Sequence, residues 1–339
     1  MRHHYFAMPP EWVPDMGKIQ KALDRLREGD ERGSHAAKAA TPASSESQSR
    51  SRPLDENSRN VLGPSFKHRR YSLPDEKSVE IPAKYSINVD IEALSEFGLQ
   101  ARGEEFDQLA QEFRRIKRPI LNIIFGEIGA GTVNSNVVMI ASALPETGKT
   151  FCSYNLALSI ARERDIGAVI VDADVLKRNI SKAFGNENRV GLIDYLLNPD
   201  TTLDDILVGT NLHDIVVVPA GQQHDEATEL LASRRMEQFT HELSLRFEAR
   251  AIIVDTPPLL LTNEAQVLAE HMGQIVVVVD TGTTTHDSLA ESLKSLNRDK
   301  PINAIMNRAR GSLGNSYGDR YGGGYFGYYS VPRNQRDAE

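Results

Sequence analysis

Residues 137–150 read VVMIASALPETGKT and pass from an apolar run into a turn that ends on Gly148-Lys149-Thr150. The apolar run is rich in β-branched residues, which indicates a strand buried on both faces. The segment that follows, FCSYNLALSIARER, has the apolar spacing of a helix. Strand, loop, Gly-Lys-Thr and helix together predict a phosphate-binding loop, or P-loop.

The loop has the groups that a polyphosphate needs. Its backbone N–H groups and the positive end of the following helix attract anions. Lys149 is expected to reach the β- and γ-phosphates, and the Thr150 hydroxyl to ligate Mg²⁺. Ala143 stands where the motif has its first glycine. The residues expected to contact the nucleotide here are Ala143, Glu146, Thr147, Gly148, Lys149, Thr150 and Phe151.

Further apolar segments predict strands that alternate with helices. Strands are expected at 167–174, 213–221, 250–258, 273–282 and 301–309, and helices at 191–208, 226–247, 263–272 and 285–298. This alternation predicts a mostly parallel sheet with helices on both faces. We expect one α/β domain over 91–310, with its functional residues at the carboxyl ends of the strands.

Polar residues end three of these strands. Asp255 takes the position of a Walker B acid, while Asp172 and Asp174, two apart on an extended strand, should point to one face. One of that pair is expected to steady Mg²⁺, and the other to accept the proton of an attacking hydroxyl. Asn307 fits either an adenine contact or a turn. The predicted catalytic residues are Lys149, Asp172, Asp174 and Asp255, and the predicted metal ligands are Thr150, Asp174 and Asp255.

Composition excludes several classes of protein. A net charge of −8 argues against general nucleic-acid binding. The single cysteine, Cys152, excludes an intramolecular disulfide framework. No apolar run approaches the roughly 18 residues that span a bilayer, and MRHHYFAMPPEW has no apolar signal-peptide core. We expect a cytoplasmic protein that reaches a membrane only through a partner.

The two ends of the chain differ from its middle. Residues 1–90 are expected to be mostly disordered, with a short helix near 17–28 that fits either a surface helix or a docking helix. Residues 311–339 are rich in glycine and tyrosine and are expected to form a flexible tail. This tail is either an adhesive low-complexity segment or a set of exposed phosphate acceptors, namely Tyr317, Tyr321, Tyr325, Tyr328 and Tyr329.

A charged helix precedes the P-loop. It is predicted from Glu104 to Arg118 and should end at Pro119. Glu112, Arg115 and Arg118 are spaced i, i+3 and i+6, so they lie along one side of it. That side fits either a solvated face or an interface.

The motifs ASALPETGKT, VIVDAD and IIVDTPP, with the C-terminal tyrosines, resemble the bacterial tyrosine kinases, or BY-kinases, over about 95–330. VDADVLKR, PAGQQHDEATELLASRRM and MGKIQKALDRLRE resemble in particular the autokinases of exopolysaccharide loci linked to exosortase/PEP-CTERM systems. The family's Walker A motif matches 143–150, its A′ motif Asp172 and Asp174, and its Walker B acid Asp255. Its E-x₂-R-x₂-R self-association helix matches Glu112, Arg115 and Arg118.

The resemblance implies a P-loop NTPase fold of the ParA/MinD-like type, with ATP and Mg²⁺ as cofactors. It also implies a ring-like homo-oligomer, in which the tyrosine tail of one subunit is phosphorylated by its neighbour. The implied activator is a membrane polysaccharide co-polymerase of the chain-length-regulator type, which would place the kinase at the inner membrane. Leu176 replaces the arginine of the family's D-x-D-x-R pattern, and Lys177 or Arg178 is expected to take its role.

Two other functions share some of these motifs. A ParA/MinD-like ATPase switch carries a lysine early in its P-loop, where this chain has Leu144. The C-terminal amphipathic membrane helix of MinD also has no counterpart in the tail. A nucleotide-binding scaffold of the export machinery without kinase activity is the second alternative, and the complete set of Lys149, Thr150 and the three aspartates argues against it.

Overall fold

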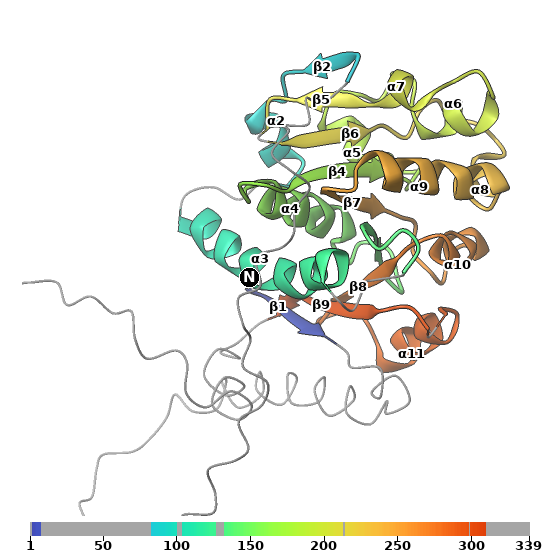
Figure 1. Ribbon diagram of the computed structural model, residues 1–339. Helices are drawn as coiled ribbons and strands as arrows, with labels where there is room; N and C mark the ends of the chain where they lie inside the picture. Colours follow the sequence, from blue (N-terminus) through green and yellow to red (C-terminus); the bar gives the residue numbers. More distant parts are fainter. Residues whose placement is uncertain are drawn as a thin grey trace, which may run out of the picture.

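The computed structural model describes residues 2–7, 83–99, 104–126, 132–212, 214–297 and 299–309. A nine-stranded sheet forms the centre of this described part (Figure 1). In spatial order its strands are β1 (Arg2–Ala7), β9 (Ile302–Ala309), β8 (Gln274–Asp280), β3 (Val137–Ala141), β7 (Arg250–Asp255), β4 (Gly167–Asp172), β6 (Ile215–Val218), β5 (Val208–Thr210) and β2 (Tyr85–Ile87). From β9 to β6 each strand is parallel to the next, as the sequence predicts. The outer strands β1 and β5 pair antiparallel with β9 and β6.

Successive residues of the central strands belong to different hydrophobic cores. In β3, Val137 and Met139 pack into one cluster, whereas Val138 and Ile140 pack into the other. The alternation follows from the period of two in a strand, and it explains why these strands are apolar throughout. The predicted two-sided α/β architecture is therefore confirmed.

Helices cover both faces of the sheet (Figure 1). One face carries α2 (Ile91–Glu96), α3 (Glu104–Phe125), α4 (Lys149–Ala161) and α5 (Asn179–Ala183). The other face carries α6 (Leu192–Leu197), α7 (Leu203–Ile206), α8 (Ala227–Leu231), α9 (Arg234–Arg246), α10 (Asn263–Glu270) and α11 (His286–Lys294). Among the described residues, none of the helices combines the length and the apolar character needed to cross a membrane.

The structure corrects the expectation of an N-terminal region without strands. Residues 2–7 form β1, which lies antiparallel beside β9, and β2 begins before the expected boundary at residue 91. Both segments pair with strands that would otherwise end the sheet with unpaired N–H and C=O groups. The expected helix at 17–28 and the tail at 311–339 lie outside the described residues.

Two helix boundaries also differ from prediction. Helix α3 continues through Pro119 to Phe125, because the residues beyond the proline, including Ile120 and Ile124, are buried in the core. The single helix expected at 191–208 is instead α6, α7 and the short strand β5. The break between α6 and α7 contains Pro199, which disfavours a continuous helix.

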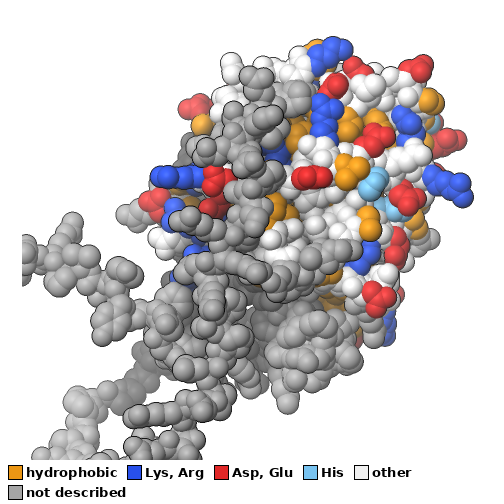
Figure 2. All heavy atoms as spheres, in the orientation of Figure 1, with side chains coloured by type: hydrophobic (Ala, Val, Ile, Leu, Met, Phe, Trp, Pro, Cys, Tyr) orange, Lys and Arg blue, Asp and Glu red, His pale blue; other side chains and the backbone are white. Residues whose placement is uncertain are grey.

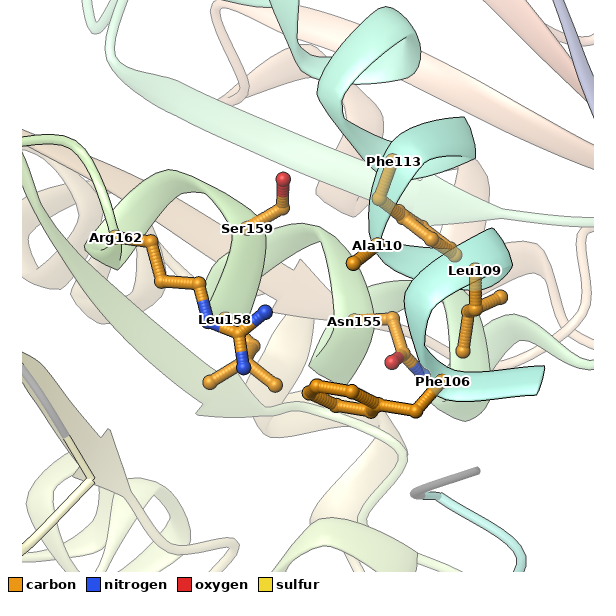
Figure 3. Close-up of a pocket in the computed structure, with 8 residues that line it drawn as sticks. All are labelled: Phe106, Leu109, Ala110, Phe113, Asn155, Leu158, Ser159 and Arg162. Atoms are coloured by element: carbon orange, nitrogen blue, oxygen red, sulfur yellow. The ribbon is translucent and has the colours of Figure 1, made fainter. Parts of the chain in front are cut away.

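Helix α3 packs against the P-loop helix α4. Figure 3 shows a pocket between them, lined by Phe106, Leu109, Ala110, Phe113, Asn155, Leu158, Ser159 and Arg162. None of the predicted nucleotide or catalytic residues lines this pocket, so it belongs to the helix packing. Beside it, the buried Lys117 Nζ donates to the Ser159 carbonyl at 2.5 Å and pairs with Glu163 at 2.6 Å. A cation there also suits the negative end of α4.

We predict that Lys117→Ala lowers the free energy of unfolding by about 1–3 kcal/mol, because a buried charge-assisted contact and its packing are lost. Lys117→Met keeps most of the packing and should be less destabilising. Arg114→Ala, an exposed change on the same helix, should stay within about 0.5 kcal/mol of wild type. Urea denaturation measures all three, and equal losses for Lys117→Ala and Arg114→Ala would contradict the prediction.

Candidate active site

The predicted P-loop connects β3 to α4 at the carboxyl edge of the sheet. Gly148 stands just before the helix with φ of 90°, a left-handed conformation that favours glycine. A Cβ at this position would lie 2.2 Å from the Asn307 Nδ2, so the loop has no room for a side chain there. The N–H groups in the first turn of an α-helix have no partner within the helix, so those at the start of α4 can donate to a bound anion.

Asp255 ties the P-loop helix to the end of β7. Its carboxylate is fully buried and accepts hydrogen bonds from Thr150 Oγ1 at 2.8 Å and from Ser153 Oγ at 3.0 Å. Burial raises the pKa of Asp255 to about 6, while Lys149 and the Thr150 hydroxyl oppose the rise. Ser153 is not among the site residues predicted from the sequence, although it lies three residues after Thr150 and therefore one helical turn away on the same side of α4.

Lys149 lies among the acidic side chains. It is only 6% exposed, and burial lowers its pKa, an effect that the charges of Asp255 and Asp174 oppose. Asp174 is 5% exposed; burial raises its pKa, and Lys149 opposes that change. The three groups therefore form one electrostatic cluster at the ends of β4 and β7.

The donor set fits Mg²⁺ bound together with a nucleotide. Thr150 and Asp255 place a hydroxyl and a carboxylate within hydrogen-bonding distance, and Asp174 adds a nearby carboxylate. No cluster of three or more His, Cys, Asp or Glu residues suited to a metal occurs among the described residues. Mg²⁺ in kinase sites uses one or two carboxylates plus substrate phosphates, so a complete protein cage is not needed.

Asp172 makes different contacts from Asp174. Its Oδ2 accepts from the Ser181 N–H at 2.7 Å and from the Ser181 hydroxyl at 2.6 Å. β4 ends at Asp172, so Asp174 lies just beyond the strand, and the expected common orientation of the two aspartates stays a prediction. Burial raises the pKa of Asp172 to about 7 against the effect of Ser181. Its Oδ1 is buried and has no hydrogen-bond partner among the described residues.

The two basic residues after Leu176 have different surroundings. Arg178 Nη1 donates to the carbonyls of Glu187 at 3.2 Å and Gly221 at 3.0 Å. Lys177 is exposed, and its charge lowers the pKa values of both Lys149 and Asp174. Lys177 is thus the better placed of the two to act near the phosphates, and its replacement of the motif's arginine stays a prediction.

The remaining predicted nucleotide residues lie on or against the loop. Ala143 and Thr147 are buried, Glu146 has φ of 61°, and Phe151 is half-buried in the first turn of α4. Asn307 Nδ2 donates to the Thr147 carbonyl at 2.7 Å, and its Oδ1 accepts from the Arg308 N–H. Both polar groups of Asn307 are therefore engaged by the protein, and its expected contact with adenine stays a prediction.

The predicted interface residues lie on α3, away from the core. Arg115 and Arg118 are exposed and Glu112 is half-buried.

On the face of the molecule in Figure 2, acidic and basic side chains are interspersed and form no large patch of one sign. The five predicted acceptor tyrosines lie outside the described residues.

No family model matches the chain. Comparison with curated proteins finds the tyrosine-protein kinase YwqD of Bacillus subtilis (strain 168), which is 31% identical over 183 residues. The match covers 53% of this chain and 76% of YwqD. This chain belongs to the bacterial tyrosine-protein kinases.

A second kinase, etk of Escherichia coli (strain K12), is 31% identical over 48% of this chain and 22% of its own length. Among solved structures, the kinase domain of Escherichia coli tyrosine kinase ETK has a TM-score of 0.51 and 27% identity, covering 60% of this chain and 78% of that domain. The chimerical protein CapA2B2 has the same fold, with a TM-score of 0.50 and 24% identity over 60% of this chain and 91% of its own. Membership of this kinase family implies a nucleotide site for ATP.

We predict that Asp172→Asn flattens the pH dependence of this kinase's stability. The folded state keeps a proton on Asp172 up to about pH 7, whereas the unfolded chain releases it near pH 4. The free energy of unfolding should therefore fall as the pH rises between these values, by about 1.4 kcal/mol per pH unit from this group. Denaturation at pH 5 and pH 8 should show a smaller fall for Asp172→Asn than for wild type.

The exposed change Asp165→Asn is the control for that comparison. It should keep the pH dependence of wild type. The prediction is contradicted if Asp172→Asn and Asp165→Asn lose the same stability between the two pH values.

Proposed function

We propose that this chain is an ATP-dependent protein-tyrosine autokinase that phosphorylates the C-terminal tyrosine cluster of a neighbouring subunit. Through this reaction it would regulate the polymerisation and export of an exopolysaccharide. The proposal rests on one observation in a chain of the tyrosine-kinase family: Thr150 and Ser153 of the P-loop helix donate hydrogen bonds to the Asp255 carboxylate. That contact joins the phosphate-binding and metal-binding sides of the site.

Phosphoryl transfer depends mainly on position and charge neutralisation. A tyrosine oxygen attacks the γ-phosphorus of ATP, the bond from that phosphorus to the bridging oxygen breaks, and ADP leaves. Lys149 would neutralise the β- and γ-phosphates, and its burial beside two carboxylates fixes where its charge lies. Thr150, Asp174 and Asp255 would hold Mg²⁺, which supplies further neutralisation of the phosphate charge.

Asp172 is the proposed acceptor of the tyrosine proton. Burial raises its pKa to about 7, and a base with a pKa near the working pH is well suited to general base catalysis. One carboxylate oxygen is held by Ser181, while Oδ1 has no partner among the described residues. Asp174, close to Lys149, is better suited to the metal side.

The acceptors are proposed to be Tyr317, Tyr321, Tyr325, Tyr328 and Tyr329 of a second subunit. The face of α3 that carries Glu112, Arg115 and Arg118 would bring subunits together in a ring-like homo-oligomer. A membrane polysaccharide co-polymerase is the proposed activator and would hold the cytoplasmic kinase at the inner membrane.

We predict that Lys149→Met abolishes ATP-dependent phosphorylation, because the phosphates lose their buried cation. Intact-mass spectrometry before and after incubation with Mg-ATP should show added phosphates on wild type, and peptide mapping should place them on the five tail tyrosines. Lys182→Met, an exposed change on α5, should behave as wild type. Phosphotyrosine retained by Lys149→Met would contradict the assigned role of the P-loop.

A mixing experiment tests transfer between subunits. The first protein is Lys149→Met, with an intact tail, and the second has all five tail tyrosines changed to Phe. Phosphate should appear on the Lys149→Met chain only in the mixture. If wild type gains no phosphate, the protein is either a nucleotide switch or a kinase that needs its activator. Repeating the assay with the cytoplasmic segment of the co-polymerase separates the two, because only the kinase then gains phosphate.

We predict that Arg115→Ala combined with Arg118→Ala shifts the protein to smaller species in light scattering, because the proposed interface loses two cations. Arg114→Ala, exposed on the same helix, is the matched control and should leave the mass unchanged. If the double variant has the mass of wild type, that face is a solvated surface.

A further inference from the structure

The end of β9 lies against the P-loop and holds it through two consecutive residues. Asn307 contacts the Thr147 carbonyl, as described above, and the next residue contacts the loop one position earlier. Arg308 Nη1 donates to the Glu146 carbonyl at 3.0 Å. The same nitrogen donates to Asp280 Oδ2 at 2.7 Å. A single guanidinium nitrogen therefore links the P-loop to the end of β8.

The Asp280 carboxylate provides a fixed anchor for this link. Its side chain is 3% exposed, and its Oδ1 accepts from the Gly282 N–H at 2.9 Å. Asp280 also pairs in register with Asn307 across β8 and β9, so the anchor and the arginine extend from adjacent strands. A charge-assisted hydrogen bond to a buried carboxylate restricts the guanidinium far more than a contact at the surface would.

Both ends of the contact have an unusual backbone conformation. Arg308 has φ of 57° and Glu146 has φ of 61°, in the left-handed region that non-glycine residues rarely occupy. Such conformations persist when surrounding contacts hold them, and they occur preferentially at ligand sites. The Arg308 N–H bond to the Asn307 side chain and the guanidinium bond to Glu146 are contacts of this kind.

We infer that Arg308, anchored by Asp280, is a positioning residue for nucleotide binding, which keeps the P-loop open to receive the phosphates of Mg-ATP. The inference rests on the nucleotide site proposed above. The Glu146 carbonyl accepts a hydrogen bond from Arg308, which fixes this peptide unit of the loop before a nucleotide binds. Without the link, the loop must be ordered when the nucleotide binds, and the affinity falls by the cost of that ordering.

The alternative is that Arg308 merely stabilises the edge of the sheet. In that case its loss lowers the melting temperature of the free protein but leaves the affinity for Mg-ATP unchanged. A positioning role predicts instead that the loss of Arg308 strongly weakens the binding of Mg-ATP. Because one nitrogen makes both contacts, the single ammonium of a lysine can replace part of them, so Arg308→Lys should recover much of the affinity.

The test is calorimetric titration of the full chain with Mg-ATP, together with the melting temperature of each nucleotide-free protein. Arg308→Met should weaken binding about tenfold, the range of one charge-assisted contact. Arg308→Lys should weaken it about threefold or less. Asp280→Asn, which removes the anchoring charge but keeps an acceptor, should give an intermediate loss. Arg164→Met, an exposed change beyond the far end of α4, is the matched control and should bind as wild type.

The outcomes separate this inference from the nucleotide site on which it rests. If wild type binds Mg-ATP and Lys149→Met does not, while Arg308→Met binds as tightly as wild type, the site stands and the role of Arg308 is overturned. Equal weakening by Arg164→Met and Arg308→Met also overturns it. If Arg308→Met fails to fold, wild-type affinity in Asp280→Asn overturns the anchored arrangement. Failure of wild type to bind Mg-ATP overturns the site and the inference together.

Discussion

The buried carboxylate of Asp255 is the group on which the arrangement of the site depends. A fully buried carboxylate is unfavourable unless hydrogen bonds and opposite charge compensate it. Thr150 and Ser153 supply the hydroxyls and Lys149 the positive charge, and all three come from the first turns of α4. Because these three side chains compensate the buried carboxylate of Asp255, they hold the start of the P-loop helix against the end of β7.

Burial of carboxylates at this site also makes their charged forms unfavourable. Burial raises the pKa values of Asp172, Asp174 and Asp255, so the folded protein keeps these acids close together at a cost in stability near neutral pH. A cluster of this kind can accommodate a metal ion and a buried cation such as Lys149. Clusters of perturbed acids are typical of active sites, where stability is exchanged for function.

Packing behind the site extends this organisation to the rest of the domain. Lys117 holds α3 against the far end of α4, and Arg308 with Asp280 holds the P-loop from β8 and β9. The P-loop and the far end of its helix are thus both held by side chains from outside the motif. Rigid support of this kind is what a site needs when catalysis depends on the position of charges.

The central parallel strands, the P-loop and the position of Lys149, Thr150 and Asp255 at one edge of the sheet could be predicted from the sequence, because apolar runs and strand-ending polar residues are local patterns. Other features required the folded chain: the pairing of β1 with β9, the continuation of α3 past Pro119, and the contacts of Ser181 with Asp172 and of Arg308 with Glu146. These features join segments distant along the chain or depend on burial. Spacing in a sequence carries no signal for such contacts, since they arise from which surfaces the folded sheet brings together.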